Sequence, residues 1–300
     1  MTEETSKVYR VSLKSILGNI LLFLGKLIFG LLAGSASLVS DAFHSLSDII
    51  STVVVIVGIK LSSRSADDCH PYGHEKIETV IAFLMGLMLF GVGGGIGGEG
   101  IRRFADQNAV HPALAYLNIA AAVMAAVSIA AKEWMYRFTI RCAKETKSQA
   151  LQADAWHHRA DALSSIGSLV GVVGLSLGYP AVDAAACLAI TVFIARAAWD
   201  ITADAFRRLV DGSTGNEIVD AVREHTLRQP EVEGIDVIKV RPQGSKLYVD
   251  MEVTMDASLT LEASHRAASR IHDAVERNVS GVKHCMIHVN PTGLAGHHHI

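Results

Sequence analysis

The sequence has few cysteines, and none of them lies close to another along the chain. Its four cysteines are Cys69, Cys142, Cys187 and Cys285, and no C-x-x-C pair occurs. Neither a disulfide framework nor a zinc knuckle is therefore expected. The formal net charge is -3 at pH 7, so no basic excess indicates nucleic acid as a partner. The H-E-x-x-H signature of zinc hydrolases is also missing from the sequence.

Charged residues are scarce as well, and long apolar runs take their place. Only 19% of the 300 residues are charged, 50% are hydrophobic, and the mean hydropathy is +0.32. Such a chain is too apolar for an ordinary soluble enzyme. About 20 residues at about 1.5 Å rise cross a hydrocarbon core of about 30 Å, so these runs predict membrane helices. Lys7, Arg10 and Lys14 lead straight into the first run, and no cleavable signal peptide is expected.

Six apolar segments predict six membrane helices, at roughly 11–34, 36–62, 77–103, 112–141, 150–177 and 181–204. Loops on one side are rich in lysine and arginine, whereas the other side has only Arg102 and Arg103. The positive-inside rule then places both termini and the basic loops in the cytoplasm. The compact loops fit an integral protein of a bacterial inner membrane.

After about residue 210 the pattern changes to that of a small soluble domain. Helices are expected at 216–227 and 260–278, and strands at 235–241, 246–255 and 282–289. The predicted fold is a membrane all-α six-helix bundle over 1–209, followed by an α-β-β-α-β, ferredoxin-like α+β cytoplasmic domain over 210–292. Residues 293–300 are expected to be a flexible tail. A domain this small would gain stability from a partner.

One octet occurs twice and carries the main functional signal. Residues 41–48 and 154–161 both have the pattern D-A-aromatic-H-x-x-x-D, and each opens a long apolar stretch. Positions i, i+3 and i+7 share one face of a helix, so each copy is a row of Asp, His and Asp. Ionisable groups are costly inside a membrane, and such rows mark an ion pathway.

The two rows predict a four-ligand metal site. The second helix runs inward and the fifth runs outward, so antiparallel packing would put His44 level with Asp161, and Asp48 level with His157. Two neutral imidazoles and two carboxylates carry a charge of -2, which a divalent cation would cancel. Four nitrogen and oxygen ligands suit tetrahedral zinc. A hydrogen-bond network inside the bundle is the structural alternative.

Asp41 and Asp154 flank this set by one helical turn, on its outer and inner sides respectively. Each would be a pathway carboxylate that attracts the ion at one mouth. The alternative is that each stabilises a helix start by capping the backbone or by interacting with the helix dipole.

These motifs resemble those of the cation diffusion facilitator family of divalent metal transporters. Residues 34–48 look like the family's second-helix signature, and 66–76 look like its loop between helices two and three. His157 and Asp161 match its fifth-helix ligands. The resemblance covers about residues 10–292, with the helices and the soluble domain in the family's order.

The resemblance implies a transport site made of His44, Asp48, His157 and Asp161. This His-Asp/His-Asp version resembles the zinc-preferring branch, whereas all-oxygen or Asn-containing sites lean toward manganese or iron. The trend has a physical reason, because imidazole suits zinc and hard oxygen ligands suit manganese.

Two further metal sites are implied by the resemblance. The first is a loop site of Asp67, His70 and His74, which Cys69 could join; the alternative is a solvated loop whose histidines have no role. The second is a regulatory site between subunits of the soluble domain, with ligands at Asp236, Glu252, His265 and His288, and with Asn290 nearby. Glu252 stands where relatives often have His, and Asn290 where Asp is common. The pattern allows either weak regulatory metal binding or no metal binding at this site.

The family resemblance also implies a homodimer, with Lys76 and Asp211 forming charge pairs across it. Lys76 alone would also satisfy the positive-inside rule without a partner. Besides the second chain, the expected partners are membrane lipid and divalent metal ions, with no nucleic acid.

The function expected from these residues is zinc export, not enzymatic catalysis. Zinc would be the substrate and a possible regulator, and protons the counter-ion in alternating-access antiport. Iron, manganese or a broad Zn/Cd/Co/Fe range are alternative substrates. A non-transporting metal sensor or assembly partner is a second alternative. An intramembrane zinc hydrolase would need an open coordination position, which the symmetric ligand set does not provide.

Overall fold

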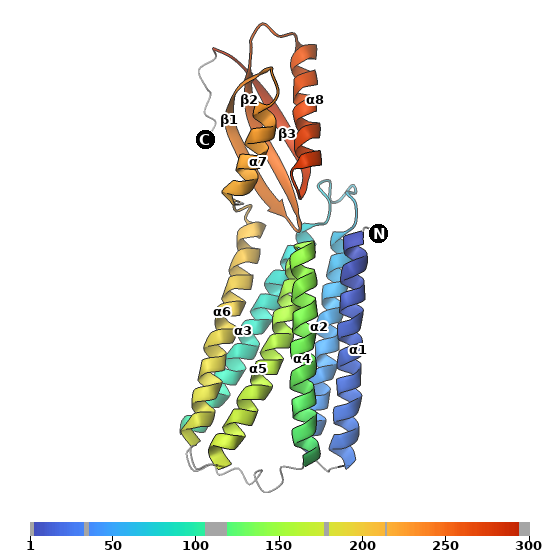
Figure 1. The fold of residues 1–300 in the computed structure, drawn as a ribbon, viewed down its shortest axis with the longest axis vertical. Helices are drawn as coiled ribbons and strands as arrows, with labels where there is room; N and C mark the ends of the chain where they lie inside the picture. The colour runs from blue at the N-terminus through green and yellow to red at the C-terminus, as the bar shows by residue number, and fades with distance from the viewer. Residues whose placement is uncertain (1–2, 33–35, 106–118, 177–179, 214, 294–300) are drawn as a thin grey trace. The chain divides into compact units, whose positions relative to one another are not determined.

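The computed structural model describes residues 3–32, 36–105, 119–176, 180–213 and 215–293. The chain divides into two compact units, residues 1–206 and 207–300, which are described separately (Figure 1). The first unit is built from six long helices, namely α1 (Glu3–Leu32), α2 (Ala36–Ser62), α3 (Lys76–Ala105), α4 (Ile119–Thr146), α5 (Gln149–Ser176) and α6 (Pro180–Leu209, whose last residues belong to the second unit). The prediction of six helices is confirmed. The expected first residues of the fourth helix, 112–118, lie outside the described residues.

Not all six helices are equally apolar. Within the described part of the chain, three segments are long and apolar enough to cross a membrane by length and composition: Ser6–Phe29, Ala42–Ser62 and Lys76–Gly98. Helices α4 and α5 instead carry charged side chains near their middles, including Lys132 and Asp161. Charges at membrane depth are tolerated where they face the inside of a bundle, so these two helices are candidates for lining an ion site.

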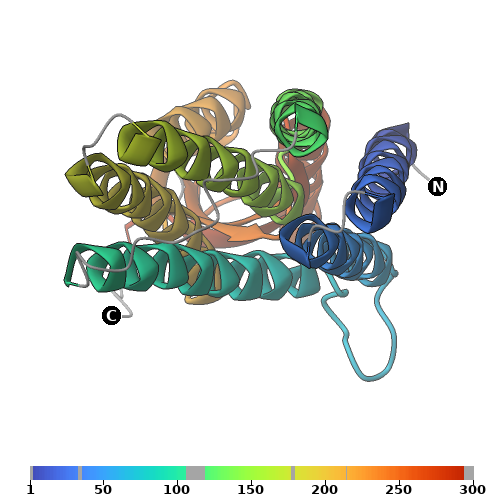
Figure 2. The same cartoon turned by 90° about the horizontal axis from the view of Figure 1, so that it is seen from below.

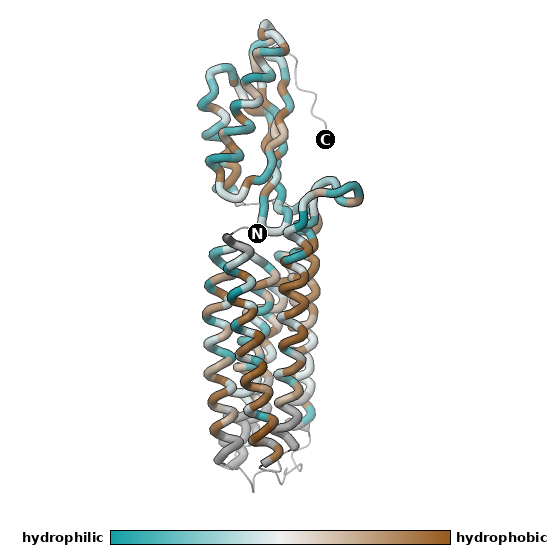
Figure 3. Tube along the Cα trace, turned by 90° about the vertical axis from the view of Figure 1, so that its right-hand side faces the viewer, coloured by the Kyte–Doolittle hydropathy of each residue, from teal (hydrophilic) through white to brown (hydrophobic). Residues whose placement is uncertain are grey.

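The bundle exposes many large apolar side chains and buries several polar ones, unlike a soluble protein. On α1, Leu13, Leu17 and Leu21 are exposed, whereas Ser15 and Asn19 are fully buried. Figure 3 shows the brown, hydrophobic residues running along these helices. Hydrocarbon around the bundle solvates the leucines, whereas Ser15 Oγ has its partner inside the protein, Thr139 Oγ1 at 3.5 Å.

Helices α3 and α6 approach closely at glycines. A side-chain carbon added at Gly97 would lie 2.9 Å from Thr191, and one added at Gly86 would lie 2.4 Å from Thr202. A larger residue at either position would force the threonine or the helices to shift. Small residues at such contacts let membrane helices pack tightly without a hydrophobic driving force between them.

Helices α2 and α5 are central to the first unit. Helix α2 contacts α1, α3 and α5, and α5 also contacts α3 and α4. The two helices that carry the repeated Asp-His-Asp rows, α2 and α5, are therefore neighbours. Figure 2, which looks at the bundle from below, shows α1 beside α2.

The second unit is a three-stranded sheet with two helices. Its elements are α7 (Asn216–Leu227), β1 (Val232–Gln243), β2 (Lys246–Met255), α8 (Leu261–Asn278) and β3 (Val282–Pro291). The strand order is β1-β2-β3, with β1 antiparallel and β3 parallel to β2. The predicted α-β-β-α-β order is confirmed. The first strand is longer at both ends than the alternation of its side chains predicted.

Alternation along β2 separates a covered face of the sheet from an open one. Val249, Met251, Val253 and Met255 are buried and pack in one core with residues of α7 and α8. The intervening Asp250, Glu252 and Thr254 point to the other face, because successive strand residues alternate sides. Helix α8 begins with a side-chain cap, in which Thr260 Oγ1 accepts the backbone N–H of Ala263 at 3.2 Å.

The core of this domain yields a stability prediction. Ile271 of α8 is fully buried against the sheet, whereas Leu261 on the same helix is 86% exposed. Ile271→Ala should lower the free energy of unfolding of the domain by about 2–5 kcal/mol, because it leaves a cavity. Hydrogen exchange of the β2 amides in the full chain measures this. Leu261→Ala is the matched control, and equal effects of the two variants would contradict the core assignment.

Candidate metal-binding sites

The repeated octets meet across α2 and α5. His44 Nε2 lies 3.5 Å from Asp161 Oδ1, and His157 Nε2 lies 3.3 Å from Asp48 Oδ1. Each histidine thus faces the aspartate of the other helix, as antiparallel packing requires. Two ligand atoms of a tetrahedral zinc lie about 3.3 Å apart, since each bond is about 2.0–2.1 Å. Each His–Asp separation suits two ligands of one ion, and three of the four side chains, without His157, form a group of mutually close ligand atoms.

The four side chains differ in exposure. Asp48, His157 and Asp161 are buried, whereas the side chain of His44 is 53% exposed. Ligand atoms of His44, Asp48 and Asp161 all lie within 4.8 Å of one another. His44 is therefore the member through which this group meets its surroundings.

A lysine that the sequence patterns did not single out lies at the centre of this group. Lys132 of α4 is buried, and its Nζ donates hydrogen bonds to Asp48 Oδ2 and, at 2.9 Å, to Asp161 Oδ2. Its ammonium bridges the two carboxylates. The sequence did offer a signal for Lys132, because a lysine in the middle of a predicted membrane helix is functional by default. Its partners depend on how α4 packs, which spacing does not reveal.

The lysine changes the charge of the site. With neutral imidazoles, two carboxylates and one ammonium sum to -1 rather than -2. Buried carboxylates need a positive charge beside them, because an unpaired charge in a low dielectric is costly. Lys132 therefore offsets half of the charge that a divalent cation would cancel at the same carboxylates.

Asp154 lies one turn along α5 from His157 and is fully buried. Thr52 Oγ1 of α2 donates to Asp154 Oδ1 at 3.2 Å, and His158 Nε2 lies 3.7 Å from Asp154 Oδ2. Because α5 begins at Gln149, Asp154 lies beyond the turn where capping occurs. The cap is Ser148, whose Oγ accepts the N–H of Leu151 at 3.3 Å.

Asp154 therefore does not cap the start of α5. It is a buried carboxylate beside the four-residue group. The side chain of Asp41, its counterpart on α2, lies outside the described residues. Its role as a pathway carboxylate stays a prediction.

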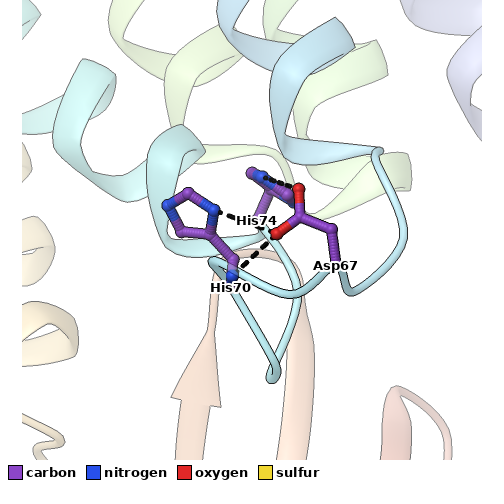
Figure 4. Close-up of side chains that lie close together, drawn as sticks. All are labelled: Asp67, His70 and His74. Atoms are coloured by element: carbon purple, nitrogen blue, oxygen red, sulfur yellow. Dashed lines mark hydrogen bonds and ion pairs between the residues drawn. The ribbon is translucent and has the colours of Figure 1, made fainter.

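The loop between α2 and α3 brings Asp67, His70 and His74 together (Figure 4). His70 Nδ1 lies 3.3 Å from Asp67 Oδ1, and His74 Nε2 lies 3.4 Å from Asp67 Oδ2. His74 is buried, whereas the side chains of the other two are more than half exposed. Cys69 contributes its backbone N–H to Asp67 Oδ1 at 3.0 Å, and its thiol is not one of the clustered ligand atoms.

Hydrogen bonds orient this loop cluster. His74 Nδ1 lies 3.2 Å from the carbonyl oxygen of Ser65, which can only accept, so Nδ1 carries the proton and Nε2 faces Asp67. The backbone N–H of His70, followed by that of Cys69, holds the pKa of Asp67 below its ordinary value. The carboxylate is therefore ionised at neutral pH, as a metal ligand must be.

The predicted ligands of the soluble domain do not form one cluster within the chain. Asp236 accepts hydrogen bonds from Thr254 and, at 2.9 Å, from Asn290 Nδ2, which also lies 3.4 Å from Glu252 Oε2. His265 and His288 are exposed, and among the described residues neither joins a group of three ligand atoms within 4.8 Å. The asparagine amide already lies between the two carboxylates.

Lys76 and Asp211 belong to different units. Lys76 is the first residue of α3, and Asp211 follows α6 with a φ of 56°. Their charge pairing across a dimer stays a prediction.

Comparison with known proteins assigns most of the chain to one family. Residues 12–210 match the cation efflux transmembrane domain, and residues 214–292 match the cytoplasmic domain of cation efflux proteins. The solved metal-bound C-terminal domain of the CzcD transporter from Thermotoga maritima covers 27% of this chain at 20% identity and a TM-score of 0.26, and no inference is drawn from it.

Curated relatives span nearly the full length. The uncharacterized transporter MJ0449 of Methanocaldococcus jannaschii is 33% identical over 92% of this chain and 95% of that protein. The manganese efflux system protein MneP of Bacillus subtilis is 28% identical over 97% and 99% of the two chains. The magnetosome protein MamB of a Magnetospira strain is 30% identical over 89% and 90%. The chain therefore belongs to the cation efflux, or cation diffusion facilitator, family and is an integral membrane transporter of divalent cations.

Proposed function

We propose that this transporter exports zinc from the cytoplasm in exchange for protons, working by alternating access as a homodimer in a bacterial inner membrane with both termini cytoplasmic. The observation that carries the proposal is the pair of histidine–aspartate contacts between α2 and α5, at 3.3 and 3.5 Å. The match of residues 214–292 to the family's cytoplasmic domain supports the dimer.

The donor atoms favour zinc among the divalent metals. Two imidazole nitrogens and two carboxylates suit zinc, whereas manganese prefers oxygen ligands. A relative named for manganese efflux nevertheless shares 28% of its residues with this chain. Manganese and iron are therefore the substrates against which zinc has to be compared.

Proton exchange follows from the same nitrogens. An imidazole nitrogen binds either a proton or a metal ion, and the reference pKa of histidine, about 6.5, lies near cellular pH. Protons arriving from outside would compete with zinc at His44 and His157, and zinc loading from inside would displace them. A pH gradient that is acidic outside then drives efflux.

We infer that Lys132 acts as the internal counter-cation of the empty site. Its ammonium bridges Asp48 and Asp161, the two carboxylates that zinc must reach. Zinc would displace the lysine on binding, and the lysine would return as zinc leaves. The transporter then never exposes two uncompensated carboxylates at membrane depth, which lowers the cost of resetting the empty carrier.

Metal specificity is tested by flux into proteoliposomes. Zinc uptake should require a pH gradient and exceed manganese and iron(II) uptake under the same gradient, because imidazole ligands favour zinc. A fluorescent indicator for each metal inside the vesicles provides the measurement. Faster manganese than zinc flux would reject zinc as the preferred substrate while retaining divalent cation transport.

The transport site itself is tested by removing one carboxylate. Asp48→Ala should reduce zinc flux to the protein-free background, because it takes away a ligand, removes the hydrogen-bond partner of His157 and leaves Lys132 with Asp161 alone. Asp200→Ala, at an exposed position of α6, is the matched control and should keep most of the flux. Elution as a folded dimer in size-exclusion chromatography must accompany each result. Wild-type flux in Asp48→Ala would place the transport site elsewhere.

The role of Lys132 separates zinc binding from turnover. Lys132→Met should tighten zinc binding at least about tenfold and slow zinc release, because two charged hydrogen bonds of about 1.5–3 kcal/mol each no longer stabilise the empty site. Lys132→Arg keeps the charge and should alter affinity less. Isothermal titration gives the affinity, and proteoliposome flux gives the rate. Unchanged affinity and flux in Lys132→Met would show that the lysine takes no part in the exchange.

A further inference from the structure

A third histidine–carboxylate cluster lies in the soluble domain, where α8 is followed by β3. His272 Nε2 lies 3.1 Å from Glu276 Oε1, and His284 Nδ1 lies 3.4 Å from the same oxygen. The three ligand atoms all lie within 4.8 Å of one another. Side-chain exposures of 36%, 27% and 47% leave the cluster accessible from solvent.

The orientation of His272 is fixed by the backbone. Its Nδ1 lies 2.8 Å from the carbonyl oxygen of Cys285, which can only accept, so Nδ1 carries a proton. In the neutral ring, the lone pair of Nε2 then points at the carboxylate of Glu276. Two acceptors facing each other at 3.1 Å repel unless a cation lies between them. Metal-binding histidines are held in the same way, with the second nitrogen donating to a carbonyl.

Glu276 is held in place as well. Its Oε1 accepts the backbone N–H of Cys285 at 3.1 Å, so the carboxylate is anchored to β3 although it belongs to α8. The separations of 3.1 and 3.4 Å are close to the roughly 3.3 Å expected between two ligands of a tetrahedral zinc with bonds of about 2.0–2.1 Å. The three atoms are thus already spaced for one ion.

We propose that His272, Glu276 and His284 form a binding site for a divalent cation of the zinc type within a single chain. The site uses three protein ligands and leaves a fourth position for water or an exchangeable group. It shares no residue with the Asp236–Glu252–Asn290 cluster on the sheet. The inference goes beyond the proposed transport function, because a cation can bind here whether or not the helical bundle moves zinc.

The neighbouring thiol is excluded as a ligand. Cys285 is buried in the domain core, and its sulfur is not one of the ligand atoms that lie within 4.8 Å of one another. The cation would be held by nitrogen and oxygen alone.

Binding would join two elements that are consecutive in the chain. His272 and Glu276 share one face of α8, four residues apart, and His284 belongs to β3. A cation that bridges them would stabilise the packing of α8 on the edge strand of the sheet. The soluble domain would then respond to the concentration of free zinc around it.

The test measures zinc binding to the full chain in detergent, by equilibrium dialysis. The background variant carries Asp48→Ala, Asp161→Ala and His70→Ala, which remove ligands of the transport and loop sites. Adding Glu276→Gln should weaken the remaining zinc binding at least about tenfold, as even indirect partners of metal ligands cost 10–100-fold. Glutamine keeps an acceptor for the Cys285 N–H, and circular dichroism checks folding.

A matched control distinguishes this site from the rest of the domain. Glu262→Gln changes the same residue type on an exposed turn of α8 and should leave zinc binding intact. Zinc should also slow hydrogen exchange in α8 and β3 of the background variant and not in Glu276→Gln. Unchanged zinc binding in both Glu276→Gln and His272→Ala, or its loss in His288→Ala alone, would overturn the proposal. None of these readouts depends on zinc transport.

Discussion

The arrangement of the helical bundle depends on neutralising two carboxylates that face each other in its interior. Asp48 and Asp161 come from different helices and share the ammonium of Lys132 from a third. Without Lys132 or a metal ion, the two buried carboxylates would have to bind protons or remain as costly unpaired charges. The need for positive charge links α2, α4 and α5 in the empty state and provides the force that attracts a divalent ion.

The same local chemistry occurs at three places in the chain. A histidine nitrogen faces a carboxylate oxygen at 3.1–3.5 Å in the bundle, in the α2–α3 loop and beside α8. In the loop and beside α8, a backbone carbonyl also fixes which nitrogen of one histidine is protonated. What differs is the surroundings. The bundle has its own lysine to balance the charge, whereas the two outer clusters meet solvent and can exchange ions directly with it.

Most of the fold could be predicted from the sequence, because helix length, apolar runs and strand alternation are local properties. The approach of His44 to Asp161 also followed from the sequence. Both helices have His and Asp four residues apart, so one antiparallel register brings both His–Asp pairs level. Lys132 could not be placed, because its position depends on how α4 packs against two other helices. His272 and Glu276 share a helix face in the sequence, but the third member, His284, approaches only when β3 folds back along α8.

The carboxylates on the open sheet face and the carboxylate beside α8 have different partners. On the open face of the sheet, the amide of Asn290 donates to Asp236 and lies close to Glu252, so hydrogen bonds already satisfy these carboxylates. A cation there would have to displace a donor that the chain itself supplies. Beside α8, an imidazole lone pair points at Glu276 instead, and an acceptor facing an acceptor can be relieved only by a proton or a metal ion. Asn290 therefore already supplies a donor to the carboxylates of the open face, while the histidines of α8 and β3 provide the proposed cation position. Within the soluble domain, that proposed position lies at the helix edge rather than on the open sheet.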